Sequence, residues 1–293
     1  MDALINFAFK CEVIRKVRDV ILPLNDIGQG PPFFCVHSVG GSATELRDLV
    51  RMLGPGQNFY GIQVPTSKRN AQFGASIREM SKYYVDELVK LQPEGAFWLG
   101  GYSIGATIAL EMAHQLIARG REVRLLVVFD GEIFNTGAEI GPYNPLYWLK
   151  ILRNVPRWIS DELVRNHRHF ANKMMARLKS TASKKTKLHS PHAVERYVNL
   201  NGILPDHAAF IKALYDSHRD YVPSHYPGHV LVFAARTHEL LRLRQVSAAW
   251  IKIAPLSEIF GIPGTHLGIM KMPRGLPVAE LLSQKIREGN ERL

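Results

Sequence analysis

The chain has 293 residues, of which 46% are hydrophobic, and it carries a formal net charge of +11. A chain of this length can bury one large α/β core or two smaller ones. No apolar run is long enough to span a bilayer, and charged residues interrupt the hydrophobic N-terminus, so neither a membrane span nor a cleaved signal peptide is expected. Its two cysteines, Cys11 and Cys35, supply neither a disulfide framework nor metal-ligand spacing, which favours a cytoplasmic protein without a bound metal.

Short apolar runs alternate with helical patterns in the first half of the chain. Strands are expected over residues 33–36, 59–64, 97–100 and 125–129, and helices over 42–53, 76–91 and 104–120. Ser42 followed by Glu45 has the spacing of a capping box at the start of the first helix. This order of elements predicts a mostly parallel central sheet flanked by helices.

The alternation stops after Asp130 and resumes near His229. Strands are expected over 229–234 and 257–262, a closing helix over 277–288, and intervening helices over 145–152, 164–178 and 208–221. A helical insertion at this point would lie above the carboxyl ends of the strands, where open α/β sheets bind ligands. We therefore divide the chain into an N-terminal extension (1–22), an α/β core (23–134 and 226–293) and a helical lid (135–225).

Most of the positive charge lies in this lid, where eleven basic residues between Lys150 and Ser190 face only Asp161 and Glu162. The basic residues are Lys150, Arg153, Arg157, Arg165, Arg168, Lys173, Arg177, Lys179, Lys184, Lys185 and Lys187. Such a patch attracts an acidic protein or an anionic surface, although a solvated helical face without a partner has the same composition. Because the run lacks interleaved aromatic residues, nucleic acid is not expected as a partner.

The motif Gly101-Tyr102-Ser103-Ile104-Gly105 lies between an apolar run and a helical pattern. A nucleophilic serine on a sharp strand-to-helix turn needs small neighbours two residues before and after it, and Gly101 and Gly105 meet that need. The pentapeptide alone is weak evidence, but its context is that of a nucleophile elbow. Ser103 is therefore the candidate nucleophile for acyl transfer, with an ordinary surface turn as the alternative.

A serine nucleophile needs a histidine to take its proton and a carboxylate to orient that histidine. His266 follows the last predicted strand in a loop containing proline and glycine, so it can return to the top of the sheet. The other histidines near the insertion and the preceding strand are expected on the surface or in the lid: His167, His169, His189, His192, His225, His229 and His238.

The acid has two candidates, Asp130 and Glu239. Asp130 is preferred because it directly follows its predicted strand, whereas Glu239 lies several residues beyond the next one. A turn cap beside Gly131 is the structural alternative for Asp130.

An oxyanion hole needs two backbone N–H donors, one from the residue after the nucleophile and one from the loop after the first core strand. Ile104 supplies the first, and the residues 37–41, here called the 37–41 loop, are expected to supply the second. His37 lies at a strand end, which favours a structural role over that of a second base.

Taken together, these segments resemble the type I thioesterase domains of nonribosomal peptide synthetases and polyketide synthases, which belong to the α/β-hydrolase superfamily. The matching segments are 22–24, 31–41, 60–63, 100–105, 129–130 and 263–266. The resemblance implies an α/β-hydrolase fold with a large helical lid, an acyl-enzyme at Ser103, Asp130 as the acid, and the amides of Val39 and Ile104 as the oxyanion hole. The lid of this chain looks longer and more basic than is usual in the family.

The resemblance also implies a substrate that an acyl or peptidyl carrier protein delivers on a phosphopantetheine arm, with no separate cofactor. The acyl chain would leave by hydrolysis or by intramolecular cyclisation. Two other functions stay open. The chain could be an ester or lipid hydrolase whose basic lid docks on anionic membranes, or a non-catalytic binding protein, although the intact Ser, Asp and His set argues against the latter.

Overall fold

The computed structural model describes residues 19–137, 140, 143–166, 194–196, 198–237 and 245–290. A seven-stranded sheet forms its centre, with the strand order β1-β3-β2-β4-β5-β6-β7. The strands are β1 (Ile21–Asn25), β2 (Phe33–Val36), β3 (Phe59–Ile62), β4 (Phe97–Tyr102), β5 (Val123–Phe129), β6 (Val230–Thr237) and β7 (Ser257–Thr265). Strands β2 to β7 run parallel, and only β1 pairs antiparallel, with β3. The predicted mostly parallel sheet is confirmed.

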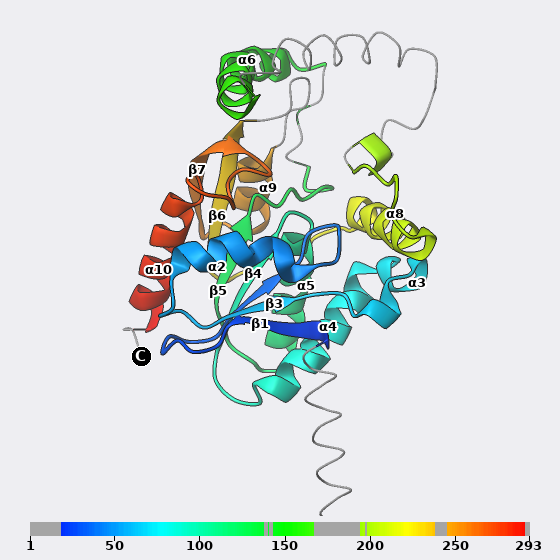
Figure 1. Ribbon diagram of the computed structural model, residues 1–293, viewed down its shortest axis with the longest axis vertical. Helices are drawn as coiled ribbons and strands as arrows, with labels where there is room; N and C mark the ends of the chain where they lie inside the picture. Colours follow the sequence, from blue (N-terminus) through cyan, green and yellow to red (C-terminus); the bar gives the residue numbers. More distant parts are fainter. Residues whose placement is uncertain are drawn as a thin grey trace, which may run out of the picture.

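Helices cover both faces of the sheet (Figure 1). In chain order they are η1 (Ala43–Leu46), α2 (Arg47–Leu53), η2 (Thr66–Lys68), α3 (Ala71–Gly74), α4 (Ile77–Leu91), α5 (Gly105–Ala118), α6 (Pro145–Asn166), η4 (Val194–Arg196), α8 (Pro205–Asp220), α9 (Val246–Ile253) and α10 (Leu276–Asn290). Helices α4, α5 and α9 pack on one face, and α2 and α10 pack on the other. This is the α/β-hydrolase architecture.

The sheet is buried on both faces, which explains why its strands are continuously apolar in sequence. Along β5, Leu126 and Val128 enter the core on the α5 side, while Val127 and Phe129 enter the core on the α10 side. Cys35 in β2 is completely buried in the second core, and burial raises the pKa of its thiol well above the usual value.

The expected helix over 42–53 is divided into a short 3₁₀ turn, η1, and the helix α2. Ser42 does cap η1, since its hydroxyl accepts a hydrogen bond from the Thr44 amide at 3.3 Å. Glu45, however, accepts a hydrogen bond from the Ser38 hydroxyl. Of the two residues of the capping-box pattern, Ser42 therefore caps η1, and Glu45 contacts the 37–41 loop instead.

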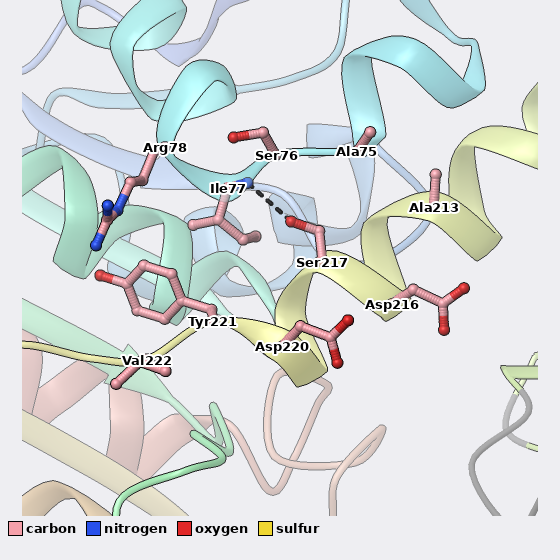
Figure 2. A pocket seen from close by; sticks show the side chains of 10 residues that line it. All are labelled: Ala75, Ser76, Ile77, Arg78, Ala213, Asp216, Ser217, Asp220, Tyr221 and Val222. Atoms are coloured by element: carbon pink, nitrogen blue, oxygen red, sulfur yellow. Dashed lines mark hydrogen bonds between the residues drawn. The ribbon is translucent and has the colours of Figure 1, made fainter.

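Among the described residues between β5 and β6, the helices α6, η4 and α8 fall within the expected lid. Helix α8 packs against α3 and α4 and buries Phe210, Ile211 and Leu214. A cavity of about 540 Å³ remains at this junction, where the Ile77 amide donates to the Ser217 hydroxyl at 2.9 Å (Figure 2). Of the triad candidates that the structure describes, Ser103, Asp130 and His266, none lines this cavity.

Helix α6 lies over the end of β6 (Figure 1). It runs to Asn166, well beyond the expected end at residue 152, and most of the helix expected over 164–178 lies outside the described residues. Within the described ranges, we find no helix with the length and apolar character needed to cross a membrane.

Candidate active site

The predicted nucleophile, Ser103, occupies the turn between β4 and α5. Its backbone has φ 59°, a left-handed conformation that a non-glycine residue adopts only when its surroundings impose it. Its amide donates to the Phe129 carbonyl at 3.0 Å, which ties the turn to the neighbouring strand. Ser103 is half-buried and lies at the carboxyl edge of the sheet.

The two elbow glycines are required by close backbone contacts. A Cβ atom at Gly101 would collide with the Gly105 carbonyl, and one at Gly105 would collide with the His37 carbonyl. The elbow is therefore pressed against both its own helix and the end of β2. Any side chain at these two positions would force Ser103 out of the turn.

Asp130 directly follows β5, as expected, and also has a left-handed backbone conformation, with φ 50°. Its side chain is buried, and Oδ1 accepts a hydrogen bond from the Ala235 amide of β6 at 2.9 Å. Oδ2 lies 2.7 Å from His266 Nδ1. The alternative acid, Glu239, lies outside the described residues.

His266 follows β7 and bridges the other two residues. Its Nδ1 lies 2.7 Å from Asp130 Oδ2, and its Nε2 lies 3.0 Å from Ser103 Oγ. Tyr102 makes two contacts with His266. The tyrosine hydroxyl donates to the His266 carbonyl at 2.9 Å, and the two rings stack with their centroids 5.1 Å apart. The three sequence candidates thus form one hydrogen-bonded series.

The 37–41 loop, which contains Val39, adjoins the elbow where the end of β2 contacts Gly105. Ile104 precedes the first residue of α5, where N–H groups have no partner within the helix and the helix dipole is positive. The expected donors, the amides of Val39 and Ile104, therefore belong to two segments in direct contact.

Sequence reasoning missed two side chains that hold the 37–41 loop. Glu45 accepts from the Ser38 hydroxyl, and burial raises the pKa of its carboxyl group. His207, from α8, donates through Nε2 to the Gly40 carbonyl at 2.8 Å. The capping-box spacing drew attention to Glu45 for a different reason, whereas no local pattern marks His207.

His37 is buried, and both of its ring nitrogens bind groups of the protein. Nδ1 donates to the Ser38 carbonyl, and Nε2 accepts from the Tyr84 hydroxyl at 2.8 Å. Burial lowers its pKa to about 4, so the ring is neutral near pH 7. This arrangement agrees with a structural role at the base of the loop.

Of the eleven basic residues of the expected lid, the structure describes the side chains of Lys150, Arg153 and Arg157, all exposed on α6. The remaining eight side chains lie outside the described residues. Within the described part of the chain, no group of three or more histidine, cysteine, aspartate or glutamate residues is arranged to hold a metal ion.

Comparison with known proteins identifies relatives of this chain. Malpibaldin synthetase from Mortierella alpina is 38% identical over 111 residues, which are 38% of this chain and 2% of that protein. Enterobactin synthase component F from Escherichia coli (strain K12) is 38% identical over 112 residues, 38% of this chain and 9% of that protein. The matched segments thus cover less than a tenth of the length of these curated relatives.

Among solved structures, the NocB thioesterase domain from the nocardicin cluster superposes with a TM-score of 0.56 at 21% identity, covering 90% of this chain and 97% of that one. At this identity the superposition supports the fold alone. The family model for the thioesterase domain matches residues 31–200, more than half of the chain. The chain therefore belongs to the thioesterase domain family, and its relatives are nonribosomal peptide synthetases and polyketide synthases.

Proposed function

We propose that this chain is a serine thioesterase that releases an acyl or peptidyl chain from the phosphopantetheine arm of a carrier protein. The observation that carries the proposal is the hydrogen-bonded series from Ser103 through His266 to Asp130. Each member follows a different strand of the sheet, which supports their assignment as nucleophile, base and acid of one site. Family membership supports the same activity.

In the first half-reaction, His266 Nε2 takes the proton of Ser103 while the serine oxygen attacks the thioester carbonyl. Asp130 accepts from Nδ1 and stabilises the imidazolium that forms. The amides of Val39 and Ile104 stabilise the oxyanion of the tetrahedral intermediate. The C–S bond then breaks, and the departing thiolate takes the proton from His266, leaving an ester on Ser103.

In the second half-reaction, His266 removes a proton from water, or from a hydroxyl or amine group of the acyl chain itself. The attacking atom forms the new acyl bond, the bond to Ser103 Oγ breaks, and the proton passes back to the serine. Water yields a free acid, and an internal nucleophile yields a ring.

The carrier protein is proposed as the partner for the basic lid. Lys150, Arg153 and Arg157 lie at helical spacing on α6, which lies over the carboxyl edge of the sheet. Cations at this edge attract an acidic domain and guide its approach through long-range electrostatics. This docking predicts a rate of association that falls as salt concentration rises.

Intact mass spectrometry after mixing the protein with a panel of acyl-pantetheine thioesters tests the proposal. We expect a covalent acyl adduct or turnover that is absent from Ser103→Ala. Ser76→Ala, a serine at the start of α4 remote from the triad in sequence and contact, is the matched control and retains the activity.

Two results would contradict the proposal. The first is the absence of any Ser103-dependent adduct or turnover across the panel. The second is a clear preference for simple aryl or lipid esters over thioesters, which would make the chain an esterase with the same triad.

A further inference from the structure

A second cavity, of about 380 Å³, lies between α6, the end of β6, the middle of β7 and the first turn of α9. Four cationic side chains line it: Lys150, Arg153 and Arg157 from α6, and Arg236 from β6. Among the described residues that line it, none is acidic. Four like charges facing one hollow repel each other, so an anion bound there would relieve the repulsion.

The four cations come to the hollow from two elements, and all four side chains are exposed. Positions 150, 153 and 157 fall on one face of α6. Arg236 lies over Gly261 of β7, where a Cβ atom would come 2.8 Å from its Nε atom. The absence of a side chain at Gly261 therefore leaves the space that the guanidinium group occupies. The first turn of α9, whose N–H groups have no partner within the helix, also lines the hollow.

This cavity lies on the same edge of the sheet as the triad. Ala235, which lines it, donates its amide to Asp130. Strand β6 is two strands away from β4, which carries Ser103, so the lateral separation is roughly 10 Å. An extended peptide or acyl chain covers that distance in about three residues.

We infer that this cavity binds an anionic group, a carboxylate, on the acyl or peptidyl chain, about three residues' length from the thioester carbonyl. The inference rests on the proposed thioesterase function and names the class of substrate. The phosphate of the carrier arm fits less well, because an extended pantetheine arm is roughly 16 Å long, about five residues of backbone, which is longer than the lateral separation of β4 and β6.

Binding of paired thioesters to Ser103→Ala tests the inference without depending on turnover. The pair consists of pantetheine thioesters of an acyl chain of about eight carbons, roughly 10 Å when extended, ending in a carboxylate or in the matched carboxamide. Calorimetry should show at least about tenfold tighter binding of the carboxylate, the value of one charge-assisted hydrogen bond.

Adding Arg153→Gln and Arg157→Gln should bring the ratio of the two affinities close to one. The matched control, Lys82→Gln with Lys212→Gln, removes the same charge from α4 and α8 outside the cavity and should keep the ratio. Equal affinities in Ser103→Ala, or a ratio that the arginine substitutions do not change, would overturn the inference.

Two further results separate the alternatives. If the arginine substitutions weaken only phosphopantetheine thioesters, and weaken carboxylate and carboxamide equally, the cavity binds the arm and the inference is wrong. If the wild-type chain hydrolyses the carboxamide thioester but shows no charge preference in binding, the inference fails while the thioesterase function stands. If no thioester is turned over although the charge preference is present, the proposed function fails instead.

Discussion

Helices α8 and α6 belong to the same stretch between β5 and β6, yet they are joined to the core in opposite ways. Helix α8 buries Phe210 and Leu214 completely and holds the 37–41 loop through His207. Helix α6 buries Ile151 but leaves four large apolar side chains more than half exposed: Leu146, Trp148, Leu149 and Leu152. Helix α8 thus helps to fix the geometry of the site, whereas α6 leaves an apolar surface accessible to a binding partner.

The largest expected effect tests whether catalysis depends on residues of the core, against which α8 packs, and not on α6. Asp130→Asn should lower kcat for a neutral thioester by about 10⁴-fold, because the amide favours the wrong histidine tautomer. Asp216→Asn, an exposed carboxylate on α8, is the matched control and should retain the wild-type rate. A loss below tenfold for Asp130→Asn would assign the acid elsewhere, with Glu239 the next residue to replace.

Stability measurements compare the two helices directly. Phe210→Ala in α8 removes a fully buried ring and should lower the free energy of unfolding by about 3–5 kcal/mol. Leu149→Ala in α6 should change it by no more than about 0.5 kcal/mol, since this side chain is 53% exposed. Urea unfolding of both variants gives the two values. Similar losses would mean that α6 is anchored as firmly as α8.

The pH dependence of stability is a second test of the core against which α8 packs, at the buried residue His37. Its folded-state pKa of about 4 lies below the unfolded value near 6.5, so the unfolded chain binds the proton more readily. This contribution to stability is complete above about pH 6.5 and is lost as the pH falls towards 4, by up to about 1.4 kcal/mol per unit. In urea unfolding at pH 7 and pH 5, His37→Gln should show a shallower loss than the wild-type chain. An equal loss of unfolding free energy between pH 7 and pH 5 in the two proteins would contradict the assignment of this effect to His37.

The smallest expected effect concerns the contact between α8 and the 37–41 loop. His207→Ala removes the hydrogen bond to the Gly40 carbonyl and should lower kcat by about tenfold with KM little changed. Lys212→Gln on the same helix is the control. Lower stability with unchanged kcat would leave His207 with a purely structural role.

The proximity of Ser103, Asp130 and His266 could be predicted because each follows a predicted strand, and parallel strands bring their carboxyl ends to one edge. The loop expected before His266 is instead the end of β7, which continues to Thr265.

The contacts of Glu45 and His207 could not be predicted, because helical periodicity identifies a buried face without identifying its partner; His207 meets a residue 167 positions away. The strand β1 escaped notice because Pro23 and Asn25 weaken its pattern. Helix α9 was not predicted because its eight residues are too few to show a helical period.

The burial of Cys35 has a consequence for a protein that handles thioesters. A thiolate near an acyl thioester would capture the acyl group by exchange and compete with a serine nucleophile. Cys35 lies in the strand that leads into the 37–41 loop, but its side chain is fully enclosed, and its raised pKa keeps it protonated. The sulfur closest along the chain to that loop is thus withheld from side reactions by packing alone.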